Sequence, residues 1–170
     1  MHFSSTFVPA TLSNVSLSID AGLNLLDMRK KKSNLLQTRV VEGIIASMKV
    51  AASHAESNFK NKLDLLEAER YGLTAYHDST AALRGYDTAI ASAQKAGFIH
   101  EQGLACEKAG FYSKRAKDNE RSLTYFNQAL ECYQKWGSSM KADFIRKELR
   151  NLGCDDGILS VWKPVRSRAA

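Results

Sequence analysis

The stretch LRGYDTAIASAQKAG at residues 83–97 is followed forty residues later by a second copy, LTYFNQALECYQKWG, at residues 123–137. The copies agree in register at Leu83/Leu123, Ala89/Ala129, Gln94/Gln134, Lys95/Lys135 and Gly97/Gly137. In each copy the apolar side chains recur at helical spacing, which predicts an amphipathic helix. Each copy closes on a glycine, the residue that adopts the left-handed C-cap conformation without steric cost. A fixed period between about twenty and fifty residues is typical of stacked-repeat proteins.

The same spacing, followed outward from the two copies, predicts further helices. First helices precede the copies, so two helix hairpins are expected at about 60–96 and 99–136. Two more helices would cover the open ends of such a stack, at about 34–54 and 139–151. Both prolines lie outside this block, and no segment alternates as a strand does. The sequence therefore predicts an all-α fold, a short right-handed stack of antiparallel helix hairpins of the tetratricopeptide-like α-solenoid type.

Composition is typical of one modest domain. The length of 170 residues with 44% hydrophobic residues favours a single domain. The Ser- and Thr-rich start and the turn signal Asp155-Asp156-Gly157 predict a flexible segment at 1–33 and a flexible tail at 153–170, on either side of a helical-repeat domain at 34–152. No apolar run approaches the length of a membrane span. Three cysteines without paired spacing indicate reduced thiols, so a cytoplasmic location is expected.

The side chains expected to form the core follow the helical stripes of the hairpins. They are Leu66, Tyr71, Tyr86, Leu104, Phe126, Leu130 and Trp136. Ala89 and Ala129 place a small residue beside an aromatic one in each copy, where two helices are expected to approach closely.

From about residue 53 to 149 the chain resembles the tetratricopeptide-like helical region of large multidomain signalling proteins. Those proteins combine a serine-threonine kinase-like domain, an AAA-type ATPase and, in many cases, a histidine-kinase module. The resemblance rests on Ser57-Asn58-Phe59 with Lys62, Leu66-Glu67-Ala68-Glu69, Tyr86-x-x-Ala89-Ile90, Ala96-Gly97-Phe98, Glu101-x-x-Leu104-Ala105-x-Glu107-x-Ala109, Phe111-Tyr112 and Tyr133-x-x-Trp136-Gly137. The repeat period in this chain is forty residues, whereas standard tetratricopeptide repeats have a period of about thirty-four residues.

The resemblance implies a regulatory arm and no catalytic domain. The phosphate-binding motif G-x-x-x-x-G-K-[ST] is absent from the sequence, as are the kinase motifs. We therefore expect a scaffold for protein–protein interaction in signal transduction that is not an enzyme and holds no cofactor. Its expected partner is a protein, for example an AAA-type ATPase or kinase domain. The chain could be a short paralogue, a degenerate copy or a truncated gene product. The candidate partner-binding residues, on the first helices of the hairpins, are Lys62, Arg70, Lys108 and Lys114.

Candidate chemical groups favour structural roles. His100-Glu101 begins like a zinc-protease helix, but HEQGL lacks the second histidine that zinc needs. His54 near Ser57 and His77 beside Asp78 have no partner set elsewhere in the sequence. We therefore expect neither an active site nor a metal site.

Two further pairs of residues bear on the expected packing of the hairpins. Cys106 and Cys132 fall on opposing helices and could approach one another, with buried, inert thiols as the expected outcome. Glu67 and Glu107 match at the repeat period, which indicates a repeated structural role, either pairing with a lysine or capping a turn.

The net charge of +6 offers an alternative, a basic helical domain that binds nucleic acid or an anionic surface. The sequence argues against it, because the excess gathers at Arg29-Lys30-Lys31-Lys32 and in the tail, while the middle mixes both signs. The aromatic residues also follow core spacing and do not resemble base-stacking platforms. We expect no nucleic-acid partner.

Overall fold

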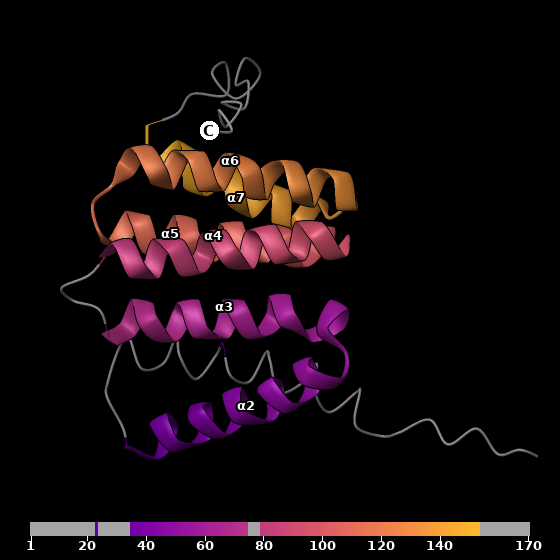
Figure 1. The fold of residues 1–170 in the computed structure, drawn as a ribbon. Coiled ribbons are helices and arrows are strands. Elements are labelled where there is room, and N and C mark those ends of the chain that lie inside the picture. Colours follow the sequence, from indigo (N-terminus) through magenta and orange to yellow (C-terminus); the bar gives the residue numbers. More distant parts are fainter. Residues whose placement is uncertain (1–22, 24–34, 75–78, 154–170) are drawn as a thin grey trace, which may run out of the picture. The chain divides into compact units, whose positions relative to one another are not determined.

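Six α-helices make up most of the described part of the chain (Figure 1). The computed structural model describes residues 23, 35–74 and 79–153. The helices are α2 (Leu35–His54), α3 (Glu56–Thr74), α4 (Ser79–Ala96), α5 (Ile99–Arg115), α6 (Asn119–Trp136) and α7 (Ser139–Asn151). Since none of these described residues lies in a strand, the all-α prediction is confirmed for them. The predicted flexible segments, 1–33 and 153–170, lie outside the described residues apart from Leu23 and Gly153.

The chain divides into two compact units, residues 1–92 and 93–170, with the boundary inside α4. Unit 1 holds α2, α3 and most of α4, and unit 2 holds α5, α6 and α7. The predicted helices at 34–54 and 139–151 agree with α2 and α7 to within one residue. The predicted hairpin at 60–96 begins earlier, at Glu56, because a single residue, Ala55, joins α2 to α3. The carboxylate of Glu56 in the first turn also suits the positive end of the helix dipole.

Left-handed residues follow four of the helices, namely Gly97, Lys117, Gly137 and, after α7, Gly153. Gly97 and Gly137 have φ of 76° and 84°, as their position at the end of each repeat predicts. At Gly137 the next amide, that of Ser138, donates to the carbonyl of Tyr133 at 3.0 Å, the bond that closes a Schellman motif. Lys117 takes the equivalent place after α5 with φ of 61°, and there the Asp118 amide donates to the Ser113 carbonyl at 3.0 Å.

In unit 1, α2 packs against α3, and α3 pairs antiparallel with α4. Val41, Ile45, Met48 and Ala52 recur at helical spacing along the buried face of α2. On α3 the buried apolar side chains are Phe59, Leu63, Leu65, Leu66 and Ala68. The helices α3 and α4 approach closely at Gly85, where a Cβ atom would lie 3.1 Å from Ala68 Cβ.

In unit 2, α5 and α6 form an antiparallel hairpin, and α7 packs on α6. The glycines of α5 set the distance between the two hairpin helices. A Cβ atom at Gly103 would lie 3.0 Å from the Tyr133 ring, and one at Gly110 would lie 2.6 Å from the Phe126 ring. Ala129 is fully buried, as expected, but these two glycines mark the tighter contacts. On α7 the buried face consists of Ala142, Ile145 and Leu149.

The predicted core is correct in four positions and wrong in two. Leu66, Tyr86, Phe126 and Leu130 are buried, and Leu104 is half-buried. Tyr71 and Trp136, in contrast, are 47% and 51% exposed. Tyr71 lies near the end of α3 with the Arg70 guanidinium over its ring at 5.2 Å. Trp136 is the last residue of α6, where its ring stacks on His100 with centroids 5.3 Å apart. Both side chains therefore lie at helix ends, beyond the packed stripe of their helices.

Candidate interaction surface

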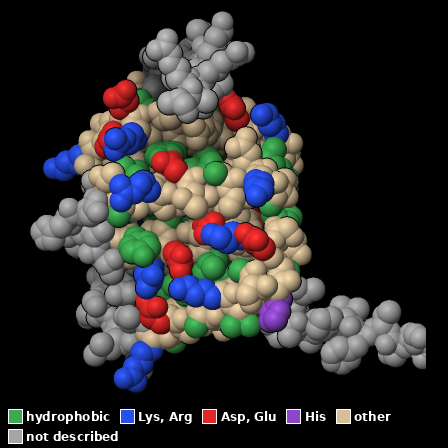
Figure 2. Space-filling view, viewed as in Figure 1, with side chains coloured by type: hydrophobic (Ala, Val, Ile, Leu, Met, Phe, Trp, Pro, Cys, Tyr) green, Lys and Arg blue, Asp and Glu red, His purple; other side chains and the backbone are tan. Residues whose placement is uncertain are grey.

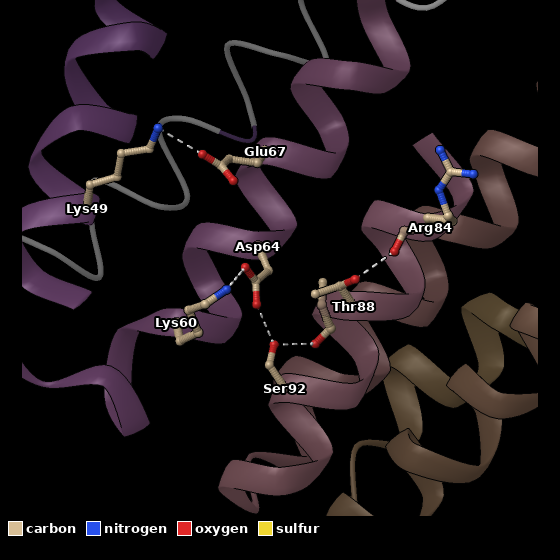
Figure 3. A network of polar contacts seen from close by, with 8 residues as sticks. Lys49, Lys60, Asp64, Glu67, Arg84, Thr88 and Ser92 are labelled. Atoms are coloured by element: carbon tan, nitrogen blue, oxygen red, sulfur yellow. Dashed lines mark hydrogen bonds and ion pairs between the residues drawn. The ribbon is translucent and has the colours of Figure 1, made fainter. Parts of the chain in front are cut away.

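The polar network of unit 1 joins neighbouring helices (Figure 3). The buried Asp64 carboxylate of α3 accepts hydrogen bonds from Lys60 and from the Ser92 hydroxyl of α4, the latter at 2.9 Å. Lys49 of α2 lies 3.1 Å from the Glu67 carboxylate of α3. Since these carboxylates meet hydrogen-bond donors or cations from the protein itself, the network stabilises the contacts of α3 with α2 and α4.

A tyrosine donates to a buried glutamate in each unit. In unit 1 the Tyr86 hydroxyl donates to Glu69 at 2.8 Å, with both side chains almost completely buried. In unit 2 the Tyr133 hydroxyl donates to Glu107 at 2.6 Å, and Lys141 of α7 donates to the same carboxylate at 3.0 and 3.1 Å. Burial, together with the neighbouring Glu107 carboxylate, raises the pKa of Tyr133. Because the Tyr133 hydroxyl keeps its proton and donates it to Glu107, this hydrogen bond holds α6 against α5.

The repeated glutamates have a repeated partner. Glu67 pairs with Lys49 and Glu107 pairs with Lys141, so each meets a lysine, one of the two roles that their spacing predicts. Their environments differ, because the tyrosine partner belongs to Glu107 in unit 2 but to Glu69 in unit 1. The repeat period of forty residues therefore predicts the glutamate–lysine pair of each unit. It does not predict the tyrosine–glutamate hydrogen bond, because the glutamate occupies different repeat positions in the two units.

The two described thiols meet between α5 and α6, as their positions in the sequence suggested. Cys106 and Cys132 are both buried and unbonded as a disulfide. A hydrogen bond with the Cys106 thiol lowers the pKa of Cys132, and the Cys106 thiol lies 3.7 Å from the Gln128 side-chain oxygen. Among residues 35–74 and 79–153, no three His, Cys, Asp or Glu side chains form a group that could hold a metal ion. His100 instead lies 3.5 Å from the Glu101 carboxylate at the start of α5.

Exposed apolar side chains gather where α6 ends and α7 begins. Trp136, Met140 and Phe144 are 51%, 83% and 40% exposed, and we call these three residues the α6–α7 apolar strip. Met140 and Phe144 lie on successive turns of α7. The Lys141 ammonium lies 5.7 Å from the Phe144 ring and 5.5 Å from the Tyr133 ring, and the Tyr133 ring contacts Trp136. All three residues of the strip belong to unit 2.

Charge is unevenly distributed between the units. Residues 93–153 contain eleven Lys and Arg against seven Asp and Glu, whereas residues 35–92 contain six against seven. Residues 93–153 therefore carry a net charge of +4, residues 35–92 carry −1, and the two chain ends outside these ranges together carry +3, so the ends account for only half of the net charge of +6. On the visible face of the molecule basic and acidic side chains are interspersed (Figure 2).

The four lysines and arginines predicted to bind a partner are divided between the two units, with Lys62 and Arg70 in unit 1 and Lys108 and Lys114 in unit 2. Lys62 donates to the Asn58 carbonyl of its own helix at 2.7 Å, and Arg70 lies 3.4 Å from the Glu42 carboxylate of α2. In unit 2, Lys114 pairs with Glu148 of α7 at 2.7 Å, while Lys108 is half-buried on the same helix. Hydrogen bonds or ion pairs within their own unit therefore involve the side chains of Lys62, Arg70 and Lys114.

No protein-family model matches this chain, and neither a curated protein nor a solved structure matches it. None of the helices in the described residues is both long and apolar enough to cross a membrane. What the chain does must therefore be argued from the surfaces and contacts described above.

Proposed function

We propose that this chain is a non-catalytic helical module that binds another protein through the α6–α7 apolar strip. The observation that carries the proposal is the exposure of Trp136, Met140 and Phe144. With about 200 Å² for each fully exposed large side chain, these fractions correspond to roughly 350 Å² of apolar surface. That area lies within the range of roughly 300–600 Å² for the largest patch on a monomeric protein, and such patches are often functional.

The buried polar groups support the non-catalytic part of the proposal. Asp64, Glu69 and Glu107 each accept hydrogen bonds from side chains of the neighbouring helices. The sequence repeat and the two antiparallel hairpins support a tetratricopeptide-like stack, similar to the regulatory arm of the signalling ATPases. An AAA-type ATPase or kinase domain is the protein partner that this resemblance favours.

A photo-crosslinking experiment tests the proposal. The photoreactive amino acid benzoylphenylalanine replaces Met140 in one variant and Thr124 in a matched control, since Thr124 is exposed on α6 about 18 Å along the helix from Trp136. Both variants are irradiated in the cells that produce the protein, and crosslinked peptides are sequenced. We expect a defined protein crosslinked at position 140 and not at position 124. The same products from both positions, or none from a folded chain, would contradict the proposal.

The alternative function, binding to nucleic acid or an anionic surface, is favoured by one observation, the basic excess of residues 93–153. Several of these cations are already paired within unit 2, among them Lys114 with Glu148 and Lys141 with Glu107. A fluorescent single strand of about twenty thymidines separates the two functions. Binding that weakens steeply with salt and survives Phe144→Glu would favour the alternative.

A further inference from the structure

We propose that the α6–α7 apolar strip receives a single amphipathic helix that carries acidic residues along the edges of its apolar face. This inference rests on the proposed function and specifies the partner's chemistry. Its basis is the area of the strip and the charge that surrounds it.

The area of the strip suits one helix. Its exposed apolar surface is roughly 350 Å², whereas a standard interface between two folded proteins buries about 800 Å² on each partner. A second copy of the chain would therefore need a further contact surface beyond these three residues. A helical segment presents a single apolar stripe of anchor residues to its partner and not a whole protein face. Because Met140 and Phe144 are spaced by one helical turn, a partner with apolar residues at i, i+3, i+4 and i+7 would match them.

The charge around the strip is positive. Residues 135–151 contain five Lys and Arg against two Asp and Glu. Both acidic residues are already paired, Asp143 with Arg146 at 2.6 Å and Glu148 with Lys114 at 2.7 Å. Lys135 follows Gln134 at the end of α6 and Lys147 lies one turn beyond Phe144.

Both Lys135 and Lys147 are exposed, and neither forms an ion pair with another described residue. Lys135 immediately precedes Trp136 in the last turn of α6, and Lys147 lies three residues after Phe144 on α7. A partner with Glu or Asp beside its apolar stripe would therefore meet cations at both ends, whereas a basic helix would be repelled. Complementary charge of this kind also suppresses wrong partners and fixes the orientation of the bound helix.

Two synthetic peptides test the proposal against the full chain. The probe is a fluorescein-labelled helix of about eighteen residues with leucine at i, i+3, i+4 and i+7, glutamate along both edges and alanine elsewhere. The matched peptide carries lysine in place of every glutamate. In fluorescence anisotropy at low salt we expect the glutamate peptide to bind at least tenfold more tightly. That difference should shrink as salt is added, because salt screens exposed charges.

Variants of the chain locate the binding site. Phe144→Glu should weaken binding of the glutamate peptide at least tenfold, and Lys147→Glu should weaken it severalfold. Thr124→Glu should leave it unchanged, since this control lies on α6 away from the strip. Circular dichroism confirms that each variant is folded. Equal weakening by Phe144→Glu and Thr124→Glu would overturn the assignment to the strip.

Other outcomes overturn the proposal in distinguishable ways. Equal binding of the two peptides would remove the acidic partner but leave the apolar strip as a binding surface. Failure of both peptides, alongside a protein crosslinked at position 140, would keep the proposed function and exclude this partner. Binding that appears only after truncation at Gly153 would assign the strip to the chain's own tail. A dimer in light scattering that Met140→Glu abolishes would assign it to a second copy.

Discussion

Alanine at Gly110 should destabilise the protein, although alanine is the better helix former. The new Cβ atom would lie 2.6 Å from both Cδ1 and Cε1 of Phe126 and 3.1 Å from Cγ. Carbon atoms pack best at about 3.5–4.0 Å, so the methyl group would lie about 1 Å too close. Phe126 cannot simply rotate away, because it is fully buried and its ring packs edge-on against Phe111 at 5.0 Å.

The magnitude of this effect follows from two opposing terms. Overpacking a filled core costs about 1–3 kcal/mol, and replacing glycine by alanine within a helix returns up to about 1 kcal/mol. The new methyl group would lie too close to Cγ of Phe126 as well as to Cδ1 and Cε1, so a small rotation of the ring cannot relieve the contact. We therefore expect Gly110→Ala to lower the free energy of unfolding by about 1–2 kcal/mol. At Gly43 nothing lies within 4 Å of the new atom, so Gly43→Ala should gain about 0.5–1 kcal/mol.

Urea unfolding followed by circular dichroism measures these differences. Gly103→Ala gives a third point, since its closest contact would be 3.0 Å. The expected order of stability is Gly43→Ala, then Gly103→Ala, then Gly110→Ala. In a Phe126→Leu background the cost of Gly110→Ala should fall by about half or more, because the two residues are in contact. A Gly110→Ala variant as stable as the parent, or a cost unchanged by Phe126→Leu, would refute the close packing of α5 on α6.

The remaining predictions concern stability. Phe126→Ala should cost about 3–5 kcal/mol, whereas Trp136→Ala, at a half-exposed position, should cost less than about 1.5 kcal/mol; thermal melts of the two variants test the difference. Lys117→Gly should stabilise by about 1 kcal/mol, because glycine adopts a left-handed conformation without cost, and an unchanged urea midpoint would argue against the φ of 61°. Tyr133→Phe should cost about 1–3 kcal/mol through the bond lost to Glu107. Above about pH 10 the unfolded chain loses the Tyr133 proton that the native chain retains, so stability falls. Tyr133→Phe should make that fall shallower in urea titrations at several pH values, and an identical pH dependence would show that the native pKa is not raised.

Much of the fold could be predicted because helices leave local signals. Apolar side chains repeat at 3.6-residue spacing, and glycine takes a left-handed conformation at helix ends, so the helices near 34–54 and 139–151 and the turns at Gly97 and Gly137 were predicted within a residue or so. Lys117 could not be predicted, since nothing in its residue type indicates a positive φ. Gly103 and Gly110 look like weak helix residues in isolation. Their contribution to the packing of α5 on α6 depends on which side chain of α6 each one faces, and the sequence does not give that contact directly.

The candidate surface was missed because burial depends on how far each helix extends past its neighbours. Trp136 shares the helical phase of the buried Tyr133, so periodicity alone places it in the core. Charge and helix position alone predict the partner-binding residues Lys62, Arg70, Lys108 and Lys114. The sequence does not show which of these cations form ion pairs with a neighbouring helix. One sequence pattern does indicate the exposed apolar side chains of α7. Within α7, Met140 and Phe144 lie on a different face from Ile145 and Leu149, so this helix carries two apolar faces.

The two faces of α7 bear on what this helix does. A helix that only closes a stack needs one apolar face toward its neighbour and a polar face toward water. The second half of α7 fits this description, because Leu149 is buried while Lys147 and Arg150 are exposed. The first half departs from it, because Met140 and Phe144 are exposed beside Trp136. Capping alone would be served equally well by a polar residue at position 140, which is 83% exposed, whereas the Phe144 ring also packs against Phe111 with centroids 6.0 Å apart. The proposed contact with another helix would account for the exposed apolar side chains in the first half of α7.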